Sequence, residues 1–147
     1  MALLELKDLI KRYPKPEGGM QVVLDVSSLN VEPGEQVALE GTSGSGKTTL
    51  LNIIAGILTP DSGSVQLAGE ELTALSESGR DRLRAEHIGY VFQTFNLLQG
   101  YTALENVLLG MAFGSGQDSG RAHALLERVG IADKAGHLPS QLSVGQQ

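Results

Sequence analysis

The chain has 147 residues, a formal net charge of −6, no cysteine and 41% hydrophobic residues. This composition is typical of a soluble globular protein with its own core, and the lack of cysteine excludes disulfides and fits a reducing cytosol. The acidic balance argues against a nucleic-acid partner, because surfaces that bind nucleic acids are usually basic. The first ten residues carry charges that a signal peptide lacks, and every apolar run is too short to cross a bilayer. We therefore expect any membrane connection to be made through another subunit.

The N-terminal part of the chain predicts an antiparallel β layer. Residues 3–9 show a half-alternating pattern that predicts an edge strand, and residues 21–26 and 28–31 predict two further short strands. Prolines and glycines predict turns at residues 14–19 and 32–35. Three short strands in series favour antiparallel pairing.

Residues 41–48 read Gly-Thr-Ser-Gly-Ser-Gly-Lys-Thr and form a complete G-x-x-x-x-G-K-[ST] motif. The short apolar run at residues 36–39 predicts a strand before the motif. The residues after it predict a helix with one apolar face, formed by Leu50, Ile53, Ile54, Ile57 and Leu58. Strand, glycine loop and helix are the setting that this motif requires.

The motif points to a site for a nucleoside triphosphate with Mg²⁺. Glycines let backbone N–H groups approach phosphate closely, and the N-terminus of a helix favours an anion. Lys47 is expected to reach the β- and γ-phosphates, and the hydroxyl of Thr48 is expected to bind Mg²⁺. The alternative is a glycine-rich turn with a surface lysine. The candidate phosphate-binding residues are Gly41, Thr42, Ser43, Gly44, Ser45, Gly46, Lys47, Thr48 and Thr49.

The rest of the chain changes from mixed to helical character. A turn at residues 59–63 ends the first helix, residues 64–67 predict a strand, and residues 68–70 predict its turn. Residues 76–86 predict a helix with Ser76 as its N-cap, and residues 88–92 predict a strand that ends at Gln93.

Two more helices are predicted at residues 102–111 and 120–129, joined by a flexible Gly/Ser link at residues 114–120. His87, His123 and His137 are isolated, with no spacing that would form a metal site.

Three further stretches resemble motifs of the ATP-binding cassette (ABC) ATPases. Residues 142–146, Leu-Ser-Val-Gly-Gln, are similar to the family signature Leu-Ser-Gly-Gly-Gln, and Val144 departs from it. Val91-Phe92-Gln93 looks like the Q-loop, and Tyr13 matches the aromatic residue that stacks on adenine. These motifs occur in the order seen in the family and cover essentially the whole chain.

The resemblance implies an α/β fold, the P-loop NTPase nucleotide-binding domain of ABC type. Its parts would be an antiparallel β layer, a RecA-like core and a helical subdomain, with residues 1–93 in the first two and 94–147 in the third. Gln93 would contact Mg²⁺ and the attacking water. ATP held by one protomer would be capped in trans by a second protomer of a head-to-tail dimer, through Ser143, Val144, Gly145 and Gln146.

Each of these residues also has an ordinary structural interpretation. Tyr13 could be an aromatic residue at a strand end, Gln93 a polar strand terminus, and residues 143–145 a loop without a ligand. A DNA-repair or chromosome-structure ATPase shares the loop and the signature. The segment between the two motifs, however, leaves no room for the long coiled coil of those proteins.

Residues 93–98 and 101–107 look most like the ATPases of bacterial lipoprotein-release, macrolide-export and cell-division complexes. The resemblance implies an integral membrane partner that docks between the Q-loop and the signature. The chain would then be cytoplasmic and peripheral on the inner face of the cell membrane.

No run of four apolar residues followed by Asp-Glu occurs in the 147 residues, although the family places such a strand after the signature. Its Asp would hold Mg²⁺ and its Glu would activate water. We therefore expect the C-terminal part of the domain to lie outside this sequence, and the 147 residues alone to bind nucleotide weakly and not to hydrolyse it. A non-catalytic nucleotide-binding fragment is the alternative interpretation.

Overall fold

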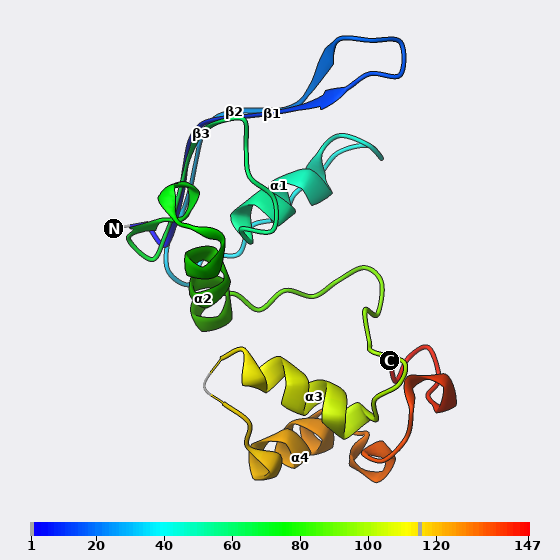
Figure 1. Ribbon diagram of the computed structural model, residues 1–147. Helices are drawn as coiled ribbons and strands as arrows, with labels where there is room; N and C mark the ends of the chain where they lie inside the picture. The colour runs from blue at the N-terminus through cyan, green and yellow to red at the C-terminus, as the bar shows by residue number, and fades with distance from the viewer. Residues whose placement is uncertain (1, 115) are drawn as a thin grey trace. The chain divides into compact units, whose positions relative to one another are not determined.

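The computed structural model describes residues 2–114 and 116–147 (Figure 1). The chain divides into a first unit that ends at Gly89 and a second unit, Tyr90–Gln147, and each is described by itself. Within the described residues, no helix has the length and apolar character needed to span a bilayer.

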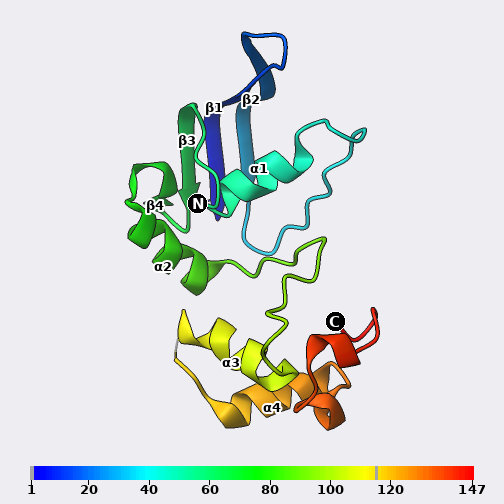
Figure 2. The ribbon, with the colours of Figure 1, turned by 45° about the vertical axis from the view of Figure 1, so that its right-hand side comes forward.

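A four-stranded antiparallel sheet forms the first unit, which confirms the predicted β layer. Its strands are β1 (Leu4–Pro14), β2 (Met20–Val31), β3 (Ser62–Leu67) and β4 (Glu70–Glu71), in the order β2-β1-β3-β4 (Figure 2). The prediction that the first strand lies at an edge is wrong, because β1 pairs with β2 on one side and β3 on the other.

The prediction of two short strands at residues 21–26 and 28–31 is also wrong. They form the single strand β2, which pairs with β1 from Pro14↔Met20 to Leu4↔Val31. The break expected at Ser27 is absent, because β1 pairs with β2 on both sides of it, Leu9 with Val26 and Lys7 with Ser28.

A bulge in β1 shapes the contact between β1 and β3. Asp8 adopts a left-handed conformation with φ 48°, and the pairing with β3 shifts register between Lys7 and Ile10. Gly63 lies directly against this bulge: a Cβ there would lie 2.5 Å from the carbonyl oxygen of Lys7 and would overlap that of Asp8. The bulge and Gly63 therefore depend on each other.

Helix α1 (Lys47–Ile54) follows the glycine loop as predicted and packs on one face of the sheet (Figure 1). Leu50 and Ile53 are buried, but Ile57 lies beyond the helix and is 48% exposed, because Gly56 turns left-handed with φ 66°. The core of the unit is almost entirely aliphatic and consists of Leu4, Leu6, Leu9, Leu24, Leu50, Ile53, Val65, Leu67, Leu72 and Leu83.

The strands predicted at residues 36–39 and 88–92 are absent from the described structure, and both segments are irregular. Their apolar side chains are exposed: Val37 by 48%, Leu39 by 37% and Val91 by 95%. A strand requires a hydrogen-bonded neighbour, and the four paired strands of the structure include no partner for either segment.

Helix α2 (Glu77–His87) begins as predicted, with the hydroxyl of Ser76 accepting from the N–H of Gly79 at 3.3 Å. The buried side chain of Leu83 packs α2 against the core of the unit. Arg84 reaches across to the C-terminal end of α1, where Nε donates to the carbonyl of Ala55 at 2.8 Å and Nη2 to that of Gly56 at 3.0 Å. A cation from α2 thus stabilises the negative end of the α1 dipole.

The second unit contains the two predicted helices, α3 (Ala103–Ala112) and α4 (Ser119–Arg128). Short 3₁₀ helices follow at Ala132–Lys134 and Pro139–Gln141. Ala103, Leu126 and Leu142 form a small core of their own. One residue of the predicted flexible link, Ser115, lies outside the described residues.

We predict that Gly63→Ala destabilises the chain by about 2 kcal/mol more than Gly69→Ala, because the added methyl group must displace backbone at the bulge. Gly69 is the matched control: its φ of 87° is also left-handed, but a Cβ there would meet nothing within 4 Å. Denaturant unfolding followed by circular dichroism measures both. Equal losses would show that left-handed strain alone accounts for the effect.

We predict an acid-sensitive cap at the start of α3. Glu105 Oε2 accepts from the N–H of Thr102 at 2.7 Å and from its hydroxyl at 2.8 Å. These bonds lower the pKa of Glu105 below its ordinary 4.5, with the Thr102 N–H as the largest cause. The stabilisation is complete above pH 4.5 and is lost as the pH falls through the folded pKa. A glutamine at this position can keep the cap but does not titrate. As the pH falls from about 5 to about 3, we therefore expect the melting temperature of the Glu105→Gln variant to decrease less than that of the parent chain. Parallel pH profiles for the two proteins would contradict this.

Candidate functional site

The glycine loop and α1 form a compact, positively charged cradle. Lys47 is the first residue of α1, and its Nζ donates to the carbonyls of Gly41 at 2.8 Å and Thr42 at 2.7 Å, and to Ser45 Oγ at 3.3 Å. The ammonium group therefore lies inside the loop. Among the described residues no side chain caps the N-terminus of α1, so its first N–H groups can bond to an external acceptor.

The backbone of the loop requires glycine. Gly46 is buried with φ 90°, and a Cβ there would lie 2.7 Å from the carbonyl oxygen of Val23 and 2.8 Å from Leu24 Cδ2. A Cβ at Gly41 would lie 2.7 Å from Ser45 Oγ. These close approaches, with a helix N-terminus and one ammonium group, fit the cradle expected for a polyphosphate.

A cavity of about 220 Å³ opens at this loop. Besides loop residues, its lining includes Leu24, Leu39 and Glu40. The sequence motif did not identify these three residues. Glu40 directly precedes the motif and could have been found by position, but Leu24 comes from β2 and is found only through the strand register.

Tyr13 lies in the same unit as the loop. Leu9 is buried in the core with α1. Lys11 and Tyr13 follow it on β1, and although the pairing with β2 is irregular between Lys11 and Arg12, Lys11 Nζ lies 5.8 Å from the centroid of the Tyr13 ring. Lys11 pairs with Leu24, the residue against which Gly46 lies, and Tyr13 is two residues, or about 7 Å, further along the strand. Tyr13 is 38% exposed.

The other two motifs lie in the second unit. Gln93 is exposed in an irregular segment. Residues 143–147 form one turn with the hydrogen bonds of a helix start: the N–H of Gln147 donates to the carbonyl of Ser143 at 3.1 Å, and the N–H of Ser143 donates to Gln146 Oε1 at 3.0 Å. Ser143, Val144 and Gly145 are exposed, and Val144 by 75%.

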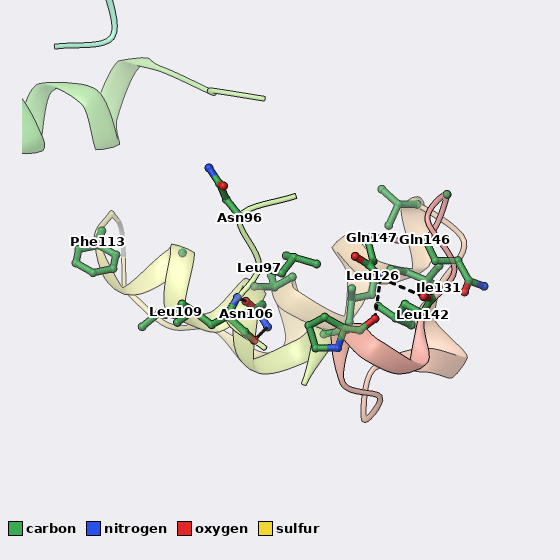
Figure 3. Close-up of a pocket in the computed structure, with 17 residues that line it drawn as sticks. Asn96, Leu97, Asn106, Leu109, Phe113, Leu126, Ile131, Leu142, Gln146 and Gln147 are labelled. Atoms are coloured by element: carbon green, nitrogen blue, oxygen red, sulfur yellow. Dashed lines mark hydrogen bonds between the residues drawn. The ribbon is translucent and has the colours of Figure 1, made fainter. Parts of the chain in front are cut away.

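Tyr13 and residues 41–49 therefore belong to one unit, and Gln93 and residues 143–146 belong to the other. The second unit also contains an apolar cavity of about 590 Å³ (Figure 3). It is lined by α3, α4 and the C-terminal residues, among them Leu126, Leu142 and Gln146. Gln147 closes one side, with its Nε2 donating to the carbonyls of Pro139 at 2.9 Å and Leu142 at 3.1 Å.

Comparison with known proteins agrees with these motifs. The lipoprotein-releasing system ATP-binding protein LolD of Pseudomonas fluorescens is 48% identical over 151 residues, which cover 99% of this chain and 65% of that protein. The macrolide export ATP-binding/permease protein MacB of Rhodopseudomonas palustris is 43% identical over 98% of this chain and 22% of its own length. The chain thus spans slightly less than two thirds of the length of the LolD relative.

Solved structures show the same architecture. The ATP-binding cassette MJ0796, a dimer in a post-hydrolysis state bound to ADP and Pi, matches with a TM-score of 0.85 and 37% identity. The match covers 97% of this chain and 64% of that one. The sequence profile of the ABC transporter family covers residues 24–147. The expected ABC-type P-loop NTPase fold is therefore confirmed, and the chain belongs to the ABC transporter family.

Proposed function

We propose that this chain belongs to the ATP-binding and ATP-hydrolysing subunit of an ABC transporter, which energises export or release of a substrate through a membrane partner. The observation that carries the proposal is the loop at residues 41–49, in which Lys47 is held inside a glycine cradle at an uncapped helix N-terminus. The similarity to LolD and MacB supports lipoprotein release or macrolide export as the kind of transport.

The glycine loop and Tyr13 of the first unit would bind ATP in two parts. The loop amides and Lys47 would hold the phosphates, and the ring of Tyr13 would stack on the base with little selectivity, because every base has a π-face. Thr48 and Gln93 would hold Mg²⁺, which supplies charge neutralisation at the β- and γ-phosphates. Gln93 would also orient the attacking water.

We propose that a second protomer completes the site. The turn at residues 143–146 would present the Ser143 hydroxyl and the Gly145 amide to the γ-phosphate held by the partner. The exposure of this turn and its helix-start geometry support this role. The similarity to the MJ0796 cassette, which is a dimer bound to ADP and Pi, supports a dimeric arrangement.

The remaining partners follow from the same proposal. An integral membrane subunit would dock on the helical subdomain, which we place after Gln93, at residues 94–147. This would make the chain cytoplasmic and peripheral on the inner face of the membrane. No role in binding nucleic acid is proposed.

We predict that Lys47→Ala weakens binding of MgATP by at least about tenfold, because it removes the charged donor to the phosphates. Lys7→Ala is the control: it removes the same charge from the same unit, and Lys7 is 60% exposed and paired with Glu5. Isothermal titration calorimetry measures both variants. Equal affinity of the Lys47→Ala variant and the parent protein would refute the proposed site.

We predict that the 147 residues alone release no phosphate from ATP above the rate of the Lys47→Ala variant, because they contain no Asp-Glu after an apolar run. The product of the complete open reading frame is the comparison. Phosphate release by the 147-residue chain that Lys47→Ala abolishes would show that another residue activates the water. No release by either protein would favour a non-catalytic nucleotide-binding module.

A further inference from the structure

Lys11 is a cation of β1 whose ammonium group is held by two partners. Its side chain is only 14% exposed, and Nζ donates to the carbonyl of Thr59 at 2.9 Å and lies 3.3 Å from Asp61 Oδ1. Both partners belong to the segment that leaves α1 and leads into β3. A lysine stem usually keeps several rotamers, but here the ammonium group is fixed from two sides.

Asp61 is itself fixed to β1. Its Oδ2 accepts from the N–H of Arg12, and its own N–H donates to the carbonyl of Ile10 at 2.9 Å. The Arg12 N–H and the Lys11 ammonium lower the pKa of Asp61, so the carboxylate is ionised at neutral pH. The three residues Lys11, Thr59 and Asp61 thus join β1 to the exit of α1.

The fixed ammonium group lies over the ring of Tyr13, 5.8 Å from its centroid. This is within the range of a cation–π interaction. The residue Tyr13 is nevertheless 38% exposed, so the lysine does not cover it completely.

We propose that Lys11 is a positioning residue for the nucleotide base: anchored by Thr59 and Asp61, it holds the ring of Tyr13 so that the accessible part of the ring receives the base. This inference rests on the proposed stacking role of Tyr13. A ring held in place before binding loses less rotamer freedom when the base stacks. Its contribution should therefore appear in the affinity for ATP and not in the affinity for phosphates alone.

The test compares MgATP with Mg-tripolyphosphate, which lacks base and sugar, on protein purified from its complete open reading frame. Lys11→Met keeps the aliphatic stem and removes the ammonium group. We expect it to weaken ATP binding by about three- to tenfold and tripolyphosphate binding by less than about twofold. Lys11→Arg should restore most of the ATP affinity, because a guanidinium group can also bond to Thr59 and Asp61 and lie over the ring.

Two further variants keep the result interpretable. Lys7→Met, on the same strand, removes an exposed cation and should change neither affinity. Asp61→Asn loosens the anchor while its amide can still accept from Arg12, so it should shift the ratio of the two affinities in the same direction as Lys11→Met. If the melting curve shows that the Lys11→Met variant does not fold, the Asp61→Asn variant tests the proposal in its place.

The outcomes separate the two proposals. If the Lys11→Met variant loses affinity equally for both ligands, Lys11 acts on the phosphates or on stability. If it loses affinity for neither ligand, Lys11 has no role in the site. Either result overturns the inference about Lys11 but not the proposed function. If the parent protein binds tripolyphosphate as tightly as ATP, the stacking role of Tyr13 fails and the inference with it. If it binds neither ligand, the proposed function itself fails.

Discussion

The close approach of Gly46 to β2 is the constraint on which the candidate site depends. A Cβ at Gly46 would overlap Val23 and Leu24, so the loop reaches its position only because this residue has no side chain. The contact fixes where α1 begins, and therefore where Lys47 and the first N–H groups of the helix lie. Since Leu24 pairs with Lys11, the same contact sets the position of the loop relative to Tyr13.

The sequence patterns correctly predicted the elements that are stabilised by contacts between residues close in sequence. The spacing of Leu50 and Ile53 gave α1, the Ser76 cap gave the start of α2, and the glycine motif gave the loop that precedes α1. In each case neighbouring residues in the sequence make the contacts that define the structure. The same holds for α3, where Thr102 and Glu105 form a capping box.

The errors concern strands, because a strand depends on a partner that may be distant in sequence. Residues 36–39 and 88–92 have apolar patterns but no paired neighbour among the described strands, whereas β2 continues through Ser27 because β1 pairs with it on both sides of that residue. The interior position of β1 could not be read from its own residues either. β1 is an interior strand because β3 pairs with its second edge. The bulge at Asp8 and the close contact of Gly63 with it allow this pairing. For the same reason Lys11 and Asp61 gave no signal in the sequence.

The contact between Arg84 and the end of α1 shows that the structure of the glycine motif depends on residues outside the motif. Helix α1 has only eight residues and no basic residue in its last turn, and isolated helices of this length are unstable in water. It persists because Leu50 and Ile53 are buried against the sheet and because a guanidinium group from α2 stabilises its carboxyl end. A peptide that contains only the glycine loop and α1 would have every residue of the motif, but it would not adopt the loop and helix conformation of the folded chain. The capacity to hold an anion thus belongs to the assembled sheet and both helices, not to the eight-letter pattern.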